Sequence, residues 1–307
     1  MKTTLWSLWL IFIFLLLSLG SFVSAATECE PLWIDEFTNQ NSRWQWGYSS
    51  GTGYHTIKTV EGLSVVEIGI TDQSQANQYS DCALAEKSYT HSSGVMEARM
   101  KVVYNGGDNQ YFGKGTMGMG FWHFTDYNSP IDAAWFFGGS PENVYPFKDF
   151  QAQVGINSAP LYLKQLPDVN LKEWHVYRVE FNNQGSKFYI DAVKVGETTS
   201  NPPTKQKITI WVDNQAVTNL NPNTGQTTRQ YYALSQDQKI LIDWVRYYDE
   251  PCDGVPSCGE GQIASSCDCG GTVYSSGYCC EGQWQQTSCS SSPYTIIPPE
   301  ILRIEIN

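Results

Sequence analysis

Flat aromatic rings are the side chains of this sequence whose number suggests a binding chemistry. Tryptophan occurs 11 times, tyrosine 18 times and phenylalanine 13 times, whereas charged residues make up only 16% of the chain. Exposed aromatic rings can stack on the flat apolar faces of sugar rings. Carboxylates are distributed less evenly, because no Glu occurs anywhere from Lys101 to Pro141. His123 and His175 lack a Ser or Cys in a recognisable nucleophile context, which favours structural roles for both.

Alternation of apolar and polar residues predicts the elements that must position these side chains. Turn signals rich in Asn, Gly and Pro separate the alternating runs, and no stretch of a dozen residues shows a helical period with caps. Many short strands without intervening helices predict an all-β antiparallel sandwich or jelly roll. The predicted strands include 63–70, 95–104, 174–181, 187–195, 207–213 and 240–248.

The charge of the chain limits its partners. The 307 residues contain 19 Lys and Arg against 31 Asp and Glu, a formal net charge of -12. Such a chain repels phosphate backbones, so nucleic acid is not expected as a partner. The composition also argues against disorder, coiled coil and collagen.

Six sequence motifs carry a family resemblance that covers residues 28–250. In this order and spacing they resemble glycoside hydrolase family 16, whose members have a concanavalin A-like jelly-roll fold and include laminarinases, lichenases and agarases. The motifs are Asp35-Glu36-Phe37, Gly94 to Val102 after Tyr89-Thr90, Gly120-Phe121-Trp122, Trp174 to Phe181, Phe188 to Asp191 and Ile242 to Tyr248.

The catalytic strand of the resembling family has the pattern Glu-x-Asp-x-x-Glu. Its first Glu and its Asp share a strand face, and a bulge returns the last Glu to that face. Two carboxylates about 5 Å apart then act as nucleophile and acid/base with retention of configuration. The corresponding segment of this chain keeps only Asp132, with Pro130 and Trp135 in place of the two glutamates. Neither proline nor indole can do their work, which indicates a pseudoenzyme.

The resemblance also implies which residues line a concave binding face. A face that keeps stacking rings and amides but loses its carboxylates favours binding of a polysaccharide over its cleavage. If catalysis persists, Asp132, Glu142 and Glu97 are the candidates for relocated carboxylates. No cofactor is required, and Asp243, before the Trp of the last strand, is the candidate ligand of a structural calcium ion. The predicted carbohydrate-binding residues are Trp122, His123, Asp132, Trp135, Phe137, Gln151, Gln153, Trp211 and Asn214.

The ends of the chain predict export and a second module. Residues 1–25 have the features of a secretory signal sequence, with Lys2 before an apolar run and small residues before Ala26. An uncleaved membrane anchor is the alternative. The expected location is therefore extracellular or at the cell surface.

Cysteine spacing predicts a disulfide module at 251–292, after the jelly roll at 26–250. Zinc is the alternative, although the segment lacks histidine and paired Cys-x-x-Cys spacing. If Cys29 pairs with Cys252, three bridges remain for the module and Cys82 is a buried free thiol. Residues 293–307 form a tail or an edge strand. The cysteines assigned to disulfides are Cys29, Cys252, Cys258, Cys267, Cys269, Cys279, Cys280 and Cys289.

Three hypotheses of function follow. The leading one is a secreted, monomeric polysaccharide-binding protein for β-glucans or galactans that has lost the family's retaining catalysis and has no stable membrane span after signal cleavage. The second is an active endo-glycoside hydrolase that uses relocated carboxylates. The third is a structural or adhesive cell-surface protein.

Overall fold

The computed structural model describes most of the predicted jelly-roll domain. The described residues are 31–46, 49–104, 114–123, 132–139, 150–156, 159–166, 168–220 and 227–249, together with short strands between 263 and 285. The predicted signal sequence and Cys29 lie outside this set. Among the described residues, no helix is long and apolar enough to cross a membrane.

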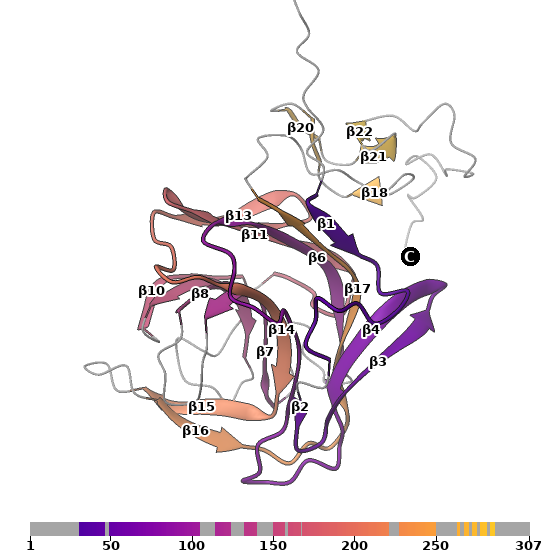
Figure 1. The fold of residues 1–307 in the computed structure, drawn as a ribbon, viewed down its shortest axis with the longest axis vertical. Coiled ribbons are helices and arrows are strands. Elements are labelled where there is room, and N and C mark those ends of the chain that lie inside the picture. Colours follow the sequence, from indigo (N-terminus) through magenta and orange to yellow (C-terminus); the bar gives the residue numbers. More distant parts are fainter. Residues whose placement is uncertain are drawn as a thin grey trace, which may run out of the picture.

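The domain is an all-β jelly-roll sandwich of two antiparallel sheets, as the sequence predicts (Figure 1). The first sheet has eight strands in the order β13-β12-β11-β6-β17-β4-β3, with β1 paired to β17. Its strands are β1 Trp33–Asp35, β3 Gly53–Val60, β4 Leu63–Ile70, β6 Gly94–Val103, β11 His175–Asn182, β12 Gly185–Ile190, β13 Val193–Thr198 and β17 Gln238–Tyr248.

The second sheet has seven strands in the order β10-β9-β8-β7-β14-β5-β2. A separate antiparallel hairpin, β15 Gln215–Leu220 with β16 Thr227–Tyr231, follows β14 and leaves this sheet (Figure 1). The seven strands are β2 Ser49–Ser50, β5 Asp81–Ala85, β7 Thr116–His123, β8 Asp132–Gly138, β9 Gln151–Ile156, β10 Ala159–Gln165 and β14 Lys207–Asp213.

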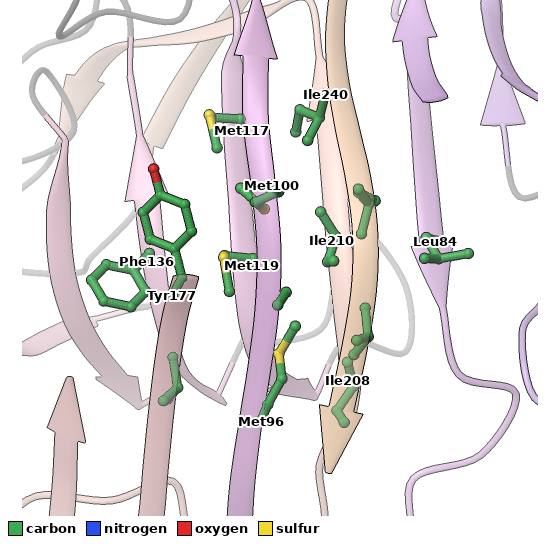
Figure 2. Close-up of a cluster of buried hydrophobic side chains, with 14 of the residues drawn as sticks. Leu84, Met96, Met100, Met117, Met119, Phe136, Tyr177, Ile208, Ile210 and Ile240 are labelled. Carbon is green, nitrogen blue, oxygen red and sulfur yellow. The ribbon is translucent and has the colours of Figure 1, made fainter. Parts of the chain in front are cut away.

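Strand alternation explains the core between the two sheets. Every second residue of β6 points inward, so Met96, Ala98 and Met100 pack in the core while Glu97 and Arg99 face outward. Figure 2 shows side chains from both sheets in this layer, among them Met117 and Ile210 of the seven-stranded sheet. The opposite residues of that sheet are therefore free to form a second surface.

One predicted strand is wrong. The segment predicted as a single strand over 187–195 is a hairpin of β12 and β13, because Asp191 and Ala192 adopt φ angles of 49° and 67°. Two consecutive residues with positive φ turn the chain back on itself in a two-residue loop. Asp191 is a residue type that tolerates this conformation.

Cys82 is a buried free thiol in the core, as predicted. Burial raises the pKa of this thiol to about 12, so it stays protonated and unreactive at neutral pH.

The described part of the predicted module consists of five short strands. They are β18 Ile263–Ala264, β19 Cys267–Cys269, β20 Thr272–Tyr274, β21 Gly277–Cys280 and β22 Gln283–Gln285. β18, β21 and β22 form one small sheet, and β19 pairs with β20. The side chains of Cys267, Cys269, Cys279 and Cys280 and the whole of Cys252, Cys258, Cys289 and the tail lie outside the described residues. The disulfides therefore stay a prediction.

Candidate functional site

The outer face of the seven-stranded sheet brings together six of the nine predicted binding residues. Strand register arranges its central side chains in two rows that run across the strands. The first row is Gln165, Gln151, Phe137, Gly118, Trp211 and Ala83, and the second is Leu163, Gln153, Trp135, Gly120, Thr209 and Ala85. Trp122 lies one step further along β7, opposite Lys207.

The large rings of this face pack on one another. The rings of Trp122 and Trp211 are stacked, with centroids 5.2 Å apart and planes at 16°. The ring centroid of Trp135 lies 4.8 Å from that of Trp211 and 6.1 Å from that of Phe137. Gly118 makes this arrangement possible, because a Cβ on it would lie 1.9 Å from the Trp211 ring. We call Trp122, Trp135, Phe137 and Trp211 the aromatic cluster.

The aromatic cluster is less exposed than a stacking platform needs to be. Its rings are each only 6–8% exposed, and Val217 of β15 belongs to the same packed group. The expectation of open rings is therefore wrong for this conformation. In this conformation the indoles offer little open surface to a sugar ring.

Neutral polar groups lie beside the cluster. Trp135 Nε1 donates a 2.8 Å hydrogen bond to Gln153 Oε1. Gln151 is 0% exposed, and neither of its amide atoms has a hydrogen-bond partner among the described residues. The buried Thr209 hydroxyl is also without a partner there. Unpaired buried polar groups cost about 1–3 kcal/mol each, so such a pair is unusual unless something else satisfies it.

Asp132 and His123 do not face the same way as the cluster. β8 pairs with β7 and β9 without a register shift, so the expected bulge is absent from the described strand. Regular alternation then puts Asp132 on the opposite side from Trp135. Asp132 accepts a 2.8 Å hydrogen bond from the Thr204 hydroxyl, and His123 Nδ1 lies 2.7 Å from the Lys205 carbonyl oxygen. Asp132 and His123 therefore do not lie on the predicted binding face.

Asn214 is a structural residue in this fold. It is 0% exposed and directly follows β14. Its Oδ1 accepts from the Ser80 backbone N–H, and its Nδ2 donates to the carbonyl oxygens of Gln78 and Tyr232. With these groups occupied, the predicted role in ligand contact does not fit.

The carboxylates named as catalytic replacements are not brought together on this face. Glu97 lies on the outer face of the other sheet, 1% exposed, where Arg178 and the Tyr248 hydroxyl hold its carboxylate. Glu142 and Pro130 lie outside the described residues. The described residues therefore do not combine Glu97 and Asp132 into a pair.

A different carboxylate pair lies at one end of the outer face. Asp213 of β14 is directly opposite Asp81 of β5, one strand step beyond Trp211 and Ala83. Side chains opposite each other in an antiparallel pair have Cβ atoms about 5 Å apart. Burial raises the pKa of both carboxyls, and for Asp213 to about 7. The alternation in 207–213 could have placed Asp213 beside Trp211, but the pairing with Asp81 depends on long-range register.

The predicted calcium ligand Asp243 forms an ion pair with Arg99. Among the described residues, no group of three or more His, Cys, Asp or Glu side chains could hold a metal ion. Calcium can also take backbone carbonyl ligands, so the site stays a prediction.

Comparison with known proteins finds resemblance only at the level of the fold. No family model matches the chain, and no curated protein sequence matches it significantly. Among solved structures, a Bacillus licheniformis β-glucanase is 19% identical, with 70% of this chain and 97% of that chain covered and a TM-score of 0.46.

Two further structures show the same degree of likeness. A prokaryotic β-1,3-1,4-glucanase (lichenase) from a mouse hindgut metagenome is 17% identical over 71% of this chain and 98% of that chain, with a TM-score of 0.45. The carbohydrate recognition domain of Emp46p is 10% identical over 70% and 95%, with a TM-score of 0.41. Such values leave the chemistry of this chain to its own residues.

Proposed function

We propose that this chain binds neutral polysaccharides of the β-glucan or galactan type at the outer face of its seven-stranded sheet, without cleaving them by a retaining mechanism. The observation that carries the proposal is the unpartnered Gln151 amide beside the aromatic cluster. An amide can both donate to and accept from sugar hydroxyls, whereas the neighbouring rings supply apolar contact.

The absence of central carboxylates supports binding over cleavage. The two rows of described residues that cross the middle of the face contain no Asp or Glu. A retaining mechanism needs two carboxyl groups on either side of the scissile bond. Gln151, Gln153, Gln165 and Thr209 are the polar residues there, and none can serve as a carboxylate nucleophile.

We also propose that the chain is secreted through residues 1–25 and that the cysteine-rich segment is a disulfide-stabilised module. The support is the composition of both segments in the sequence.

One observation favours hydrolysis as a second candidate, namely the Asp81 and Asp213 pair on the same face. A pair in which one carboxyl is protonated and the other ionised is what general acid catalysis requires. The surroundings favour a structural role instead. Asp213 is 1% exposed, and its Oδ1 accepts from the Thr116 backbone N–H, the Thr116 hydroxyl and the Gln215 backbone N–H.

A combined binding and cleavage screen separates the candidates. The mature chain from Ala26 is tested against β-glucans and galactans by affinity gel electrophoresis, and reducing ends are measured in the same incubations. Retarded migration without new reducing ends supports the proposal. Release of reducing ends that Asp213→Asn abolishes would establish the hydrolase, and no interaction with any polymer would leave the structural role.

A further inference from the structure

The base of the β15–β16 hairpin is fixed by a compact set of hydrogen bonds. Asn214 ties the hairpin to the segment just before β5 through Ser80 and Gln78, and the backbone N–H of Tyr232 donates to the Asn214 carbonyl oxygen at 2.9 Å. The rings of Tyr79 and Tyr231 are in contact, with centroids 5.3 Å apart. Because Val217 of this hairpin packs with the aromatic cluster, the hydrogen bonds at the base also help to hold that contact.

Asp213 connects this base to the sheet. Its Oδ1 receives the Thr116 backbone N–H at 3.0 Å, the Thr116 hydroxyl at 2.8 Å and the Gln215 backbone N–H at 3.1 Å. Thr116 begins β7 and Gln215 begins β15, so one carboxyl joins the sheet to the first residue of the hairpin. Loss of this contact would remove one link between the sheet and the hairpin.

The carboxyl opposite Asp213 is also buried. Asp81 is 7% exposed and accepts hydrogen bonds from the Ser50 hydroxyl at 2.7 Å and the Tyr79 hydroxyl at 3.3 Å. Neither carboxyl forms an ion pair with a described residue. The cation at the hairpin base is Lys114, whose Nζ lies 5.7 Å from the Tyr232 ring centroid. Other titratable or charged residues on the described elements that carry or flank the pair include Tyr79, Cys82, His123, Lys207, Arg229, Tyr231 and Tyr232.

We propose that the proton of Asp213, opposite the buried Asp81 carboxyl, acts as a pH-dependent latch that keeps the β15–β16 hairpin and its Val217 packed against the aromatic cluster. While the proton is present, the pair carries a single negative charge and the hydrogen bonds at the base stay formed. When it leaves, two like charges face each other in a buried site where neither carboxyl has an ion pair among the described residues, which costs energy that opening of the hairpin relieves. The proposal concerns the hairpin and stands whether or not the face binds polysaccharide.

The direction of the effect follows from burial. Burial and, to a smaller extent, the charge of Asp81 raise the pKa of Asp213 to about 7, although the hydrogen bonds from Thr116 and Gln215 oppose this rise. In an opened hairpin the carboxyl meets water and its pKa returns toward the ordinary value near 3.9. The closed state therefore binds the proton more tightly, so the closed hairpin is favoured at acidic pH and lost as the pH rises through about 7.

Amide hydrogen exchange of the full chain, corrected for intrinsic rates, tests the latch. We expect protection of β15 and β16 amides to fall about thirtyfold between about pH 5.5 and about pH 8.5, because proton binding changes tenfold per pH unit above the pKa of the open state. Asp213→Asn, which keeps an accepting oxygen for Thr116, should retain protection at both pH values. Asp168→Asn, an exposed acid elsewhere, should behave like the unchanged protein.

Several outcomes would overturn the latch. Protection that does not change with pH in the unchanged protein would do so, as would an undiminished pH dependence in Asp213→Asn. If Asp213→Asn does not fold, Asp81→Asn removes the partner and must also flatten the pH dependence. Restoration of protection at about pH 8.5 by calcium chloride would show that a metal ion, and not a proton, neutralises the pair.

Discussion

The two sheets both bury polar side chains on their outer faces, but they neutralise them differently. On the eight-stranded sheet, Arg178 lies 3.1 Å from Glu97 and 2.6 Å from Glu180, and the Tyr248 hydroxyl adds a hydrogen bond to Glu97. On the seven-stranded sheet, the described residues leave Gln151 and Thr209 without partners and place Asp213 beside Asp81. Paired groups of this kind hold a structure together, whereas unpaired ones indicate a site that something else completes.

The largest expected effect comes from removing the buried cation on the outer face of the eight-stranded sheet. Arg178→Met leaves Glu97 and Glu180 buried without their cation, and loss of one partner of a buried ion pair costs about 3–5 kcal/mol. Chemical denaturation measures the change in the free energy of unfolding. Lys194→Met is the control, because its ion pair with Glu197 is about half exposed and should matter little. Equal effects of both variants would contradict the contrast between buried and exposed pairs.

The second effect is a pH dependence of the free energy of unfolding, which arises from Asp213 on the seven-stranded sheet. Burial raises the pKa of Asp213 to about 7. Because the folded state binds the Asp213 proton more tightly than the unfolded state does, protonation stabilises the fold. This stabilisation is complete below the unfolded pKa near 3.9 and is lost as the pH rises to the folded pKa, by at most about 1.4 kcal/mol per pH unit. Thermal or chemical unfolding between these limits should show stability falling with pH. Asp213→Asn should remove most of the slope, and an unchanged slope would assign it to other groups.

A smaller effect is expected at the unpartnered amide. Gln151→Leu removes two unsatisfied polar atoms without a large change in shape, so we expect the free energy of unfolding to rise by about 1–2 kcal/mol. Gln184→Leu, at an exposed turn of the other sheet, is the matched control and should not be stabilised. A destabilised Gln151→Leu would mean that the amide is satisfied in the folded protein, and the contrast between the two faces would weaken.

The smallest effect concerns the turn between β12 and β13. Asp191 Oδ2 lies 2.6 Å from His175 Nδ1. Burial of His175 lowers its pKa, but the hydrogen bond with Asp191 and the Asp191 charge outweigh this and raise it. A raised His pKa stabilises the fold at acidic pH and this is lost as the pH increases. Asp191→Asn should therefore cost less than about 1 kcal/mol below neutrality and nothing at alkaline pH, because Asp191 is 43% exposed. A larger loss at alkaline pH would indicate a role in the turn itself.

The sequence predicts the fold well where one strand face is apolar. The limits of β4 and β14 agree with the predicted runs over 63–70 and 207–213, because alternation is unbroken there. The hairpin at Asp191 and Ala192 was missed since a two-residue turn without Gly leaves the alternation almost intact.

The candidate site is only partly predictable. The cluster residues share a strand face that alternation alone can find, for example Trp135 with Phe137. The bulge implied by the family resemblance is absent from the described part of β8. Asp132 therefore lies on the side of the sheet opposite to Trp135, and its predicted place beside the cluster is wrong. The partnership of Asp81 with Asp213 spans more than a hundred residues, and the low exposure of the rings depends on Val217 from a separate hairpin.

Polysaccharide binding by Gln151→Leu and Gln184→Leu, measured side by side with reducing-end release, tests the central claim most directly. The account predicts that Gln184→Leu and the unchanged protein are retarded equally in a polysaccharide gel, that Gln151→Leu binds about tenfold more weakly although it is folded and no less stable, and that none of the three releases reducing ends. Equal retardation of both variants, or reducing ends released by the unchanged protein, would contradict it.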